Sequence, residues 1–593
     1  MKYICLLLLG AFFCTVAHGQ VDLHACAGNW EGKWDDPGAF GLHLGVRALG
    51  ADRYRLVVYG RDTLVSRDFK MGSGAVSAGA GEASTGETFA VRLDSGLTFK
   101  GRWDGARIEG FMCAGRLDYH VVLSGKGFLS GSWNPLLVAV PDSVAYLDVE
   151  VDSTGGGYEA YPFLQDNRWT GFWAFRFSRV GDSLFFTDAK TGLGFRARLW
   201  DTAHISLEAM LGGRRLAAVE LRPSTRSWNL QRPFERVSFL GRRPEGGRRS
   251  QEARGQDGDG WPLASALDGG LDTAHLARME DSVYAGTLTH VHSVLVARHG
   301  KLLYEGYFEG YDASVPHDLR SAAKSVASAI TGLAITHHRL VSDEARVFPL
   351  LPWPYRDAGR GDSLKQAIRI KDLLTMSSGL DAVDFGIDRT SPGSEDVYQT
   401  TPDWLQTVVN VSMLSGPGQH ALYSSANPYL LGVIVDSLVG PDPEHFMDRF
   451  LFEPLGITDY VLQQDDRGRP YFGGGWYLRP RDMLTFGQAY LDGGLWKGHR
   501  VLSEDWVKKS TMTRLILENH PEKPGYGYLW WSYSYTVGTR TYKTIEARGA
   551  GGQYIFLVPS EGLVVVVTSG NFRNGRTNQP EKIFGDYILA GLH

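Results

Sequence analysis

Short runs of alternating apolar and polar residues dominate the first part of the chain. Examples are RYRLVVYG (53–60), TFAVRLDS (88–95), VAYLDVEVDS (144–153) and DSLFFTDA (182–189), separated by Gly, Asp and Asn clusters. Alternation with a period of two places the apolar side chains on one face of a strand. The pattern predicts an all-β region over residues 20–240.

A weak internal repeat lies within this region. The segment GLTFKGRWDG, which starts at Gly96, resembles GLGFRARLWD, which starts at Gly192. Two related β modules, or two halves of one barrel or sandwich, would give such a repeat. A β-meander reuses the same turn residues by chance, so the repeat alone leaves both interpretations open.

The pattern of apolar and polar residues changes after residue 240. Residues 241–260 are charged, Gly-rich and nearly free of large apolar side chains, which is the composition of a linker. Over residues 261–593, strand hairpins at 292–308 and 551–570 enclose a series of helical patterns. A sheet built from both ends of a domain with helices in between predicts an α+β architecture.

Composition narrows the functional classes. A length of 593 residues predicts about three or four domain-sized units. The 43% hydrophobic and 21% charged residues are typical of a folded protein. A net charge of -5 is small for this size, so nothing indicates a nucleic-acid partner.

The N-terminus predicts export. In residues 1–19, Lys2 precedes an apolar run from Tyr3 to Ala17, and Ala17-His18-Gly19 resembles a signal-peptidase site. Phe12 and Phe13 differ from the residues that precede a lipidated cysteine, and no later segment has about 18 uninterrupted apolar residues. We therefore expect a periplasmic or extracellular protein without a membrane anchor.

Two cysteines remain after removal of the predicted signal. Cys26 and Cys113 both lie in the β region, and in an exported protein such a pair is expected to form a disulfide. The alternative is two buried free thiols. Neither interpretation gives the cysteines a catalytic role.

The segment LRSAAKSVASAITGLAI holds Ser321 and Lys324 three residues apart, at the start of an apolar run. In a helix these residues share one face, together with Ser325 and Ser328. Burial disfavours a charged amine and so lowers its pKa, and a neutral Lys324 beside Ser321 would accept the hydroxyl proton. Taken alone, however, the spacing is equally typical of a capped core helix with an extended lysine.

Other segments support the catalytic interpretation. LLTMSSGL, PGQHALYSSANPYLLGVIV, GGGWYLRPRDMLTFGQAYLDGGLWKG, YGYLWW and GAGGQYIFLVPSEGLVVVV follow in order. With the segment around Ser321 they resemble the serine β-lactamase and penicillin-binding-protein superfamily, in its branch of class C β-lactamase-like esterases and 6-aminohexanoate-dimer hydrolases. The resemblance covers residues 261–593. It implies an antiparallel sheet flanked by helices, a helical subdomain, and catalysis by Ser321 and Lys324.

The resemblance also assigns further residues. Tyr423 matches the tyrosine of the family's Tyr-x-Asn motif, which relays protons, and Ser425 stands where the motif has its substrate-binding Asn. On the strand facing the nucleophile, Gly549 and Gly551 are expected to contact substrate. The backbone N–H groups of Ser321 and Ala550 are expected to form the oxyanion hole. Ala547 occupies the place of the family's cation, which weighs against β-lactam recognition.

No cofactor or metal is expected. His290, His292, His337 and His338 lack the spacing of a zinc site, and the Gly473–Gly475 run lacks the lysine of a phosphate loop. Asp384, Asp388 and Trp404 fall in the predicted variable wall of the pocket, where they either select substrate or stabilise the loop. The predicted partner is a small ester or amide, and the sequence does not indicate an oligomeric state.

The sequence thus predicts a serine hydrolase that forms an acyl-enzyme on Ser321, with Lys324 as general base. One alternative is a D,D-peptidase or β-lactamase acting on cell-wall-type substrates. A second is a non-catalytic binding protein built on the same fold, in which the β region recognises the ligand. The retention of Ser321, Lys324 and Tyr423 favours an enzyme.

Overall fold

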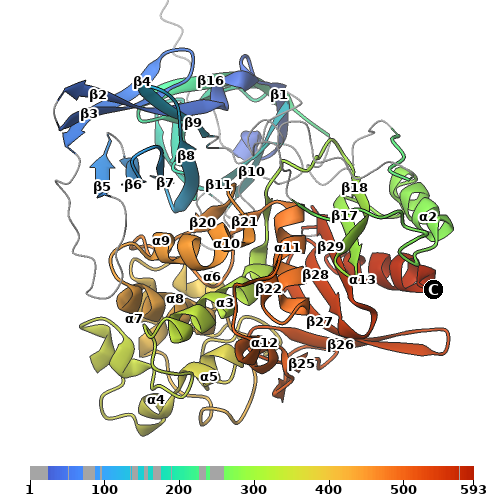
Figure 1. The fold of residues 1–593 in the computed structure, drawn as a ribbon. Coiled ribbons are helices and arrows are strands. Elements are labelled where there is room, and N and C mark those ends of the chain that lie inside the picture. Colours follow the sequence, from blue (N-terminus) through green and yellow to red (C-terminus); the bar gives the residue numbers. More distant parts are fainter. Residues whose placement is uncertain are drawn as a thin grey trace, which may run out of the picture.

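The structure is a computed structural model, shown as a ribbon in Figure 1. It describes residues 24–50, 52–70, 87–93, 96–133, 135, 144–151, 158–164, 175–188, 190–225, 236–240, 260–572 and 574–593. The predicted signal peptide and residues 241–259 of the predicted linker lie outside the described residues. Among the described helices, none has the length and hydropathy needed to cross a bilayer.

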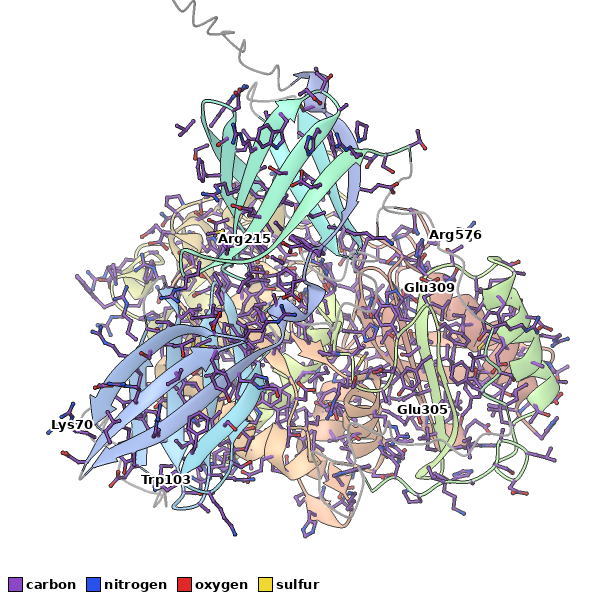
Figure 2. All side chains as sticks on the ribbon, turned by 90° about the horizontal axis from the view of Figure 1, so that it is seen from above. Lys70, Trp103, Arg215, Glu305, Glu309 and Arg576 are labelled. Carbon is purple, nitrogen blue, oxygen red and sulfur yellow. The ribbon has the colours of Figure 1, made fainter. Side chains whose placement is uncertain are left out.

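The first β module consists of two antiparallel sheets. One has the order β4-β3-β2-β9, and the other contains β8-β7-β6-β5. Its strands are β2 (Leu42–Gly50), β3 (Arg53–Tyr59), β4 (Thr63–Lys70), β5 (Glu87–Arg92), β6 (Thr98–Trp103), β7 (Ile108–Ala114), β8 (Leu117–Leu123) and β9 (Phe128–Trp133). Lys70 and Trp103, which end β4 and β6, lie on the opposite side of the molecule from Glu305 and Glu309 of the C-terminal domain (Figure 2).

The second β module is a closed eight-stranded barrel. Its strands are β1 (Gly28–Lys33), β10 (Val144–Val151), β11 (Tyr158–Leu164), β12 (Phe175–Val180), β13 (Ser183–Thr187), β14 (Gly194–Asp201), β15 (His204–Leu211) and β16 (Arg214–Pro223). Alternate residues fill its interior, as Ile205, Leu207 and Ala209 of β15 do. The sequence repeat falls on β6 and β14, each the fifth strand of its module when counted from β2 and from β10.

The C-terminal domain is built on an eight-stranded antiparallel sheet with the order β18-β17-β29-β28-β27-β26-β25-β24. Its strands are β17 (Val291–Arg298), β18 (Lys301–Tyr307), β24 (Leu515–Ile516), β25 (Gly525–Tyr526), β26 (Trp531–Val537), β27 (Arg540–Gly549), β28 (Gln553–Val558) and β29 (Leu563–Ser569). Strands from both ends of the domain meet at β17 and β29, as the hairpin patterns predict.

Helices cover both faces of this sheet (Figure 1). The valines of β29 alternate between them: Val564 and Val566 pack with α3 (Ala323–Thr336) and α11 (Pro480–Leu491). Val565 and Val567 pack with α2 (Thr273–Tyr284), and with the C-terminal turns that follow α13 (Gln579–Lys582). A strand buried on both faces needs a continuous apolar run, which explains the sequence LVVVV in β29.

A helical subdomain lies beyond α3. It contains α4 (Ser363–Ala367), α5 (Ile370–Leu374), α6 (Glu395–Tyr398), α7 (Trp404–Asn410), α8 (Ala426–Val439), α9 (Pro443–Met447) and α10 (Glu453–Leu455), while α12 (Glu504–Thr511) packs against α3. Helix α8 is buried along most of its length and packs against α3 and α5. The predicted fold class, an all-β region followed by an α+β domain with a helical subdomain, is confirmed.

The first β module and the C-terminal domain share one sheet. Strand β20 (Val461–Gln463) pairs antiparallel with β8, with Val461 opposite Tyr119 and Gln463 opposite Leu117. The sheet continues through β21 (Tyr477–Leu478) to β19 (His317–Asp318), which immediately precedes the segment around Ser321. The β region is therefore joined to the C-terminal domain by backbone hydrogen bonds close to the candidate catalytic residues.

The predicted disulfide is wrong. No disulfide joins Cys26 to Cys113 in the structure. Cys26 is buried in the apolar core shared by the β modules, whereas Cys113 of β7 packs against the core of the C-terminal domain. Its neighbours in β7, Met112 and Ala114, face the β core, so Cys113 points to the opposite side of its sheet from the core that holds Cys26.

Candidate active site

Ser321 lies in a short 3-10 turn, Arg320–Ala322, between β19 and α3. The apolar residues around it, Leu319 and Ala322, are completely buried, and they anchor the turn to the core while Ser321 stays at the surface of that core. Helix α3 begins at Ala323, two residues later than the helix predicted from sequence. Ser321 is therefore presented by a tight turn at the entrance of a buried helix.

Lys324 points back from the first turn of α3 toward Ser321. Its Nζ lies 2.8 Å from Ser321 Oγ and also donates to the carbonyl oxygen of Gly473. Only 1% of Lys324 is exposed. A buried amine held by two oxygens in this way has a fixed orientation, with the hydroxyl of Ser321 as one of the two partners.

The charge of Lys324 differs from the sequence prediction. Burial disfavours the ammonium, but the Tyr423 phenol and the carboxylates of Glu395 and Asp384 favour it more strongly, so the pKa of Lys324 is raised. Sequence reasoning considered burial and did not anticipate the two carboxylates. Lys324 is consequently an ammonium at rest, and its neutral form is a minor species at neutral pH.

Tyr423 lies beside this amine. Lys324 Nζ is 5.2 Å from the centroid of the Tyr423 ring, which stacks on Phe385 and packs against Trp531 at centroid separations of 5.1 and 5.4 Å. Burial raises the pKa of the Tyr423 phenol, while Lys324 and the Ser321 hydroxyl act to lower it, and the net direction is upward. Tyr423 is therefore a neutral phenol at rest, within reach of both Ser321 and Lys324.

Ser425 forms hydrogen bonds with two carboxylates, those of Asp384 and Glu395. Its backbone N–H donates to Asp384 Oδ2 at 2.7 Å, and its hydroxyl donates to Glu395 Oε2 at 3.2 Å. The Glu395 N–H donates to Asp384 Oδ1 at 3.0 Å. Burial, followed by the charge of Glu395, raises the pKa of Asp384 to about 6. An Asn at position 425 would lose the hydroxyl bond to Glu395, whereas the bond from the backbone N–H to Asp384 does not depend on the side chain.

Sequence reasoning missed this carboxylate pair as a unit. It placed Asp384 in the pocket wall without a role, together with Asp388 and Trp404. Asp388 is exposed, and Trp404 is buried in the helical subdomain. The sequence offered only a local signal, since Asp384 and Glu395 lie on either side of the loop that precedes α6. Acidic residues are common at helix starts for unrelated reasons, so this signal did not identify the pair.

The C-terminal end of β27 closes the other side of the site. A Cβ added to Gly549 would lie 2.1 Å from Leu319 O and 3.1 Å from Ala322 N, so only glycine allows this strand to approach the Ser321 turn so closely. Ala550 follows as an exposed turn residue. Gly551 instead donates its N–H to Thr577 Oγ1 at 2.9 Å, so that this donor is already engaged.

The strand provides no free cation at the substrate side. Ala547, which the sequence analysis aligned with the family's cation, is completely buried in the core. The neighbouring Arg548 donates to Glu546 Oε2 at 2.6 Å and to Glu581 Oε1 at 2.7 Å. Its guanidinium carbon is also 3.5 Å from the centroid of the Tyr533 ring. Arg548 is thus committed to structural contacts.

The geometry places four predicted elements together: Ser321, Lys324, Tyr423 and the Gly549–Ala550 corner. Comparison with a family model matches the same C-terminal domain that contains these residues. Residues 282–584 match the profile of the family described as Beta-lactamase. The chain is 25% identical over 294 residues to the 6-aminohexanoate-dimer hydrolase of Paenarthrobacter ureafaciens, a match that covers 46% of this chain and 71% of that protein.

Two solved structures each resemble about half of the chain. EstCE1, described as a hydrolase with promiscuous acyltransferase activity, has a TM-score of 0.44 and 16% identity, over 54% of this chain and 99% of EstCE1. A penicillin-binding-protein homologue from Caulobacter crescentus has a TM-score of 0.40 and 16% identity, over 50% of this chain and 91% of that protein.

Proposed function

Because this chain belongs to the β-lactamase family and is a serine hydrolase of that family, we propose that it is an exported esterase or amidase that forms an acyl-enzyme on Ser321. The observation that carries the proposal is the 2.8 Å contact between Lys324 Nζ and Ser321 Oγ, with the Tyr423 ring beside the same amine. Export rests on the N-terminal sequence.

In the proposed acylation, Ser321 Oγ attacks the carbonyl carbon of the substrate, and its proton passes to the neutral form of Lys324. The negative charge that develops on the carbonyl oxygen is stabilised by the N–H groups of Ser321 and Ala550. The bond to the leaving group then breaks, and Tyr423 donates a proton to the departing oxygen or nitrogen. Lys324 returns its proton to Tyr423, which restores both groups.

In the proposed deacylation, water attacks the acyl carbon and transfers a proton to the amine–phenol pair. The proton then goes to Ser321 Oγ as the acyl bond breaks. Because Lys324 rests as an ammonium, it must release its proton before acylation, and entry of an apolar substrate assists by removing water and further disfavouring the charged form.

The charges around the site favour neutral or cationic substrates. Ala547 provides no cation, and Arg548 is held by two glutamates. Two carboxylates, Asp384 and Glu395, lie within electrostatic reach of Lys324. A substrate carboxylate next to the scissile bond would be repelled by this pair. This arrangement argues against the alternative of a D,D-peptidase or β-lactamase, because β-lactams carry such a carboxylate.

Covalent labelling tests the proposal. The wild-type chain, the variant Ser321→Ala and the control Ser328→Ala are treated with a fluorophosphonate probe and then with a panel of p-nitrophenyl esters, short amides and nitrocefin. Ser328 is a suitable control because it is a buried serine of the same helix. We expect labelling and ester hydrolysis in wild type and Ser328→Ala, and neither in Ser321→Ala. Folded wild-type protein that remains unlabelled would support a binding protein instead.

A further inference from the structure

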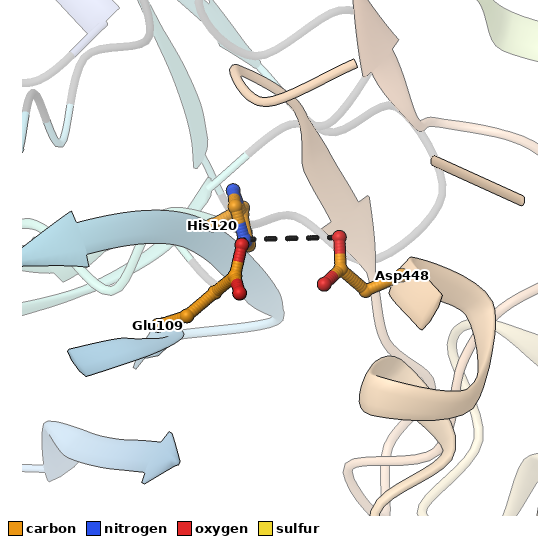
Figure 3. Close-up of side chains that lie close together, drawn as sticks. All are labelled: Glu109, His120 and Asp448. Carbon is orange, nitrogen blue, oxygen red and sulfur yellow. Dashed lines mark ion pairs between the residues drawn. The ribbon is translucent and has the colours of Figure 1, made fainter. Parts of the chain in front are cut away.

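A cluster of three ionisable side chains lies at the joint between the first β module and the C-terminal domain. Glu109 of β7 and His120 of β8 face Asp448, which begins the turn Asp448–Phe452 after α9 (Figure 3). The three side chains are nearly inaccessible, with exposed fractions of 9%, 1% and 2%. The cluster thus combines residues separated by more than 300 positions in the sequence.

The spacing within the cluster is unlike that of a hydrogen-bonded ion pair. His120 Nε2 lies 3.5 Å from Glu109 Oε1 and 3.8 Å from Asp448 Oδ1, and the three ligand atoms are all within 4.8 Å of one another. Charge-assisted hydrogen bonds measure about 2.7–2.9 Å. A tetrahedral ion with ligands at about 2.0–2.1 Å holds neighbouring ligand atoms about 3.3 Å apart. The two gaps from His120 Nε2, 3.5 and 3.8 Å, are closer to the second geometry than to the first.

Surrounding groups orient His120 toward the cluster. Its Nδ1 lies 2.9 Å from Thr458 O, which can only accept, so Nδ1 carries a proton. The ring stacks on Tyr460 with centroids 4.8 Å apart and an interplanar angle of 10°. The Tyr460 hydroxyl in turn donates to Asp448 Oδ1 at 2.7 Å. In the neutral ring the lone pair is therefore on Nε2, and such a backbone partner for the other nitrogen is typical of metal-binding histidines.

Two atoms in the cluster lack hydrogen-bond partners. His120 Nε2 and Asp448 Oδ2 are buried and accept or donate no hydrogen bond among the described residues. Glu109 is partly neutralised from the opposite side, where its Oε2 lies 3.6 Å from both Arg102 and Arg107. Buried polar atoms without partners are costly, and a cation would satisfy His120 Nε2, the unpartnered atom that faces both carboxylates.

We propose that Glu109, His120 and Asp448 bind a single Zn²⁺-class ion that fastens the first β module to the C-terminal domain, with water as a fourth ligand. A ligand set of one imidazole and two carboxylates suits Zn²⁺ and Co²⁺, whereas Mg²⁺ and Ca²⁺ require more oxygen ligands. The ion has a structural role, because its ligands come from both sides of the joint. The sequence prediction of no metal site missed this cluster because no two of its ligands share a local motif.

The alternative to a bound metal ion is a proton on His120. Burial lowers the pKa of His120, but Glu109 and Asp448 act in the opposite direction and the net pKa is raised. An imidazolium between two carboxylates would account for the cluster without a metal. The test must therefore distinguish a bound ion from a bound proton.

The test uses the full chain, purified without a histidine tag. Metal content is measured by mass spectrometry, and chelator-treated protein is then titrated with Co²⁺ while visible absorption and thermal unfolding are followed. We expect one Co²⁺ per chain, with the intense d–d bands of a tetrahedral site, and a higher midpoint of unfolding that added Zn²⁺ reproduces. The Asp448→Asn and Glu109→Gln variants should lose both signals.

Asp118→Asn is the matched control. Asp118 is a buried carboxylate at the same joint, contacts Gln464 and does not belong to the cluster. This variant should bind Co²⁺ as wild type does. Wild-type protein that takes up no stoichiometric Zn²⁺ or Co²⁺ would overturn the proposal in favour of the imidazolium. Equal binding by Asp448→Asn and wild type would also overturn it, since the ion would then occupy an adventitious surface site. The wild-type spectrum decides the matter even if a variant fails to fold.

Discussion

Lys190 of the barrel module forms an ion pair with Asp318, three residues before Ser321, with Nζ and Oδ2 separated by 2.8 Å. Lys190 and Asp318 side chains are 5% and 11% exposed. The same carboxylate accepts the Arg320 N–H at 2.9 Å. Despite burial, which acts to raise it, Arg320 and Lys190 lower the pKa of Asp318 to about 2. The second β module therefore supports the turn that presents Ser321.

Replacing Lys190 with Met should destabilise the protein and reduce turnover. Removing one partner of a buried pair costs up to about 3–5 kcal/mol, and Arg320, which also pairs with Asp318 at 3.3 Å, offsets part of that loss. The stability that Asp318 contributes is present above its unfolded pKa of 3.8 and is lost as pH falls through about 2, so the effect of Lys190→Met should be fully visible at pH 7.

Chemical unfolding at pH 7 measures this effect, and kcat on a p-nitrophenyl ester measures the consequence for Ser321. The double variant Lys190→Met, Asp318→Asn should recover part of the stability, because the buried Asp318 charge is removed, while Arg320 loses its ion pair. If the single variant retained wild-type stability and kcat, the pair would not support the Ser321 turn.

Tyr423→Phe should affect amides far more than activated esters. A p-nitrophenolate departs without a proton, whereas an amide nitrogen must be protonated, and loss of a general acid costs roughly 100-fold to 10,000-fold. We expect a kcat reduction of that order for amides and a much smaller one for p-nitrophenyl esters. Equal losses on both substrate classes would assign Tyr423 to a structural role.

Glu395→Gln should move the rising limb of the pH–rate profile, which reports the loss of the Lys324 proton, to lower pH. Only the neutral amine accepts the Ser321 proton, so kcat/KM rises with pH until Lys324 has lost its proton. The charge of Glu395 is among the causes that raise the pKa of Lys324. Removing that charge should lower this pKa. A profile of unchanged position in Glu395→Gln would contradict the proposed influence on Lys324, and Glu522→Gln on the surface serves as a charge-matched control.

Asp384→Asn should stabilise the protein above pH 6. The folded pKa of Asp384 is about 6 and exceeds its unfolded value of 3.8, so folding favours the protonated form. Its stability contribution is complete below pH 3.8 and decreases as pH rises through 6. An amide avoids this loss, which is on the order of 1–3 kcal/mol, and the net gain is smaller because an amide accepts only one of the two backbone N–H bonds. Thermal unfolding should show a higher midpoint for the variant at pH 7.5 and little difference at pH 4, and the opposite order would contradict the prediction.

Local patterns predicted much of the fold. The hairpins at β17–β18 and β28–β29, the buried α3 and the family of the C-terminal domain follow from short apolar periods and ordered motifs. The disulfide prediction failed because it used only compartment and cysteine count, while the two thiols face different cores. The roles of Ser321, Lys324, Tyr423 and Ala550, and export itself, stay predictions.

The sequence alone identified the candidate nucleophile and its amine, since Ser321 and Lys324 are three residues apart within an ordered set of family motifs, and such residues share one face of a helix. Only the tertiary structure decided the charge of Lys324, the partners of Ser425 and the support of Asp318 by Lys190. The physical reason is that helix and strand periods are local, whereas electrostatic interactions act between groups that folding brings together from distant segments, such as Glu395 with Lys324 and Lys190 with Asp318.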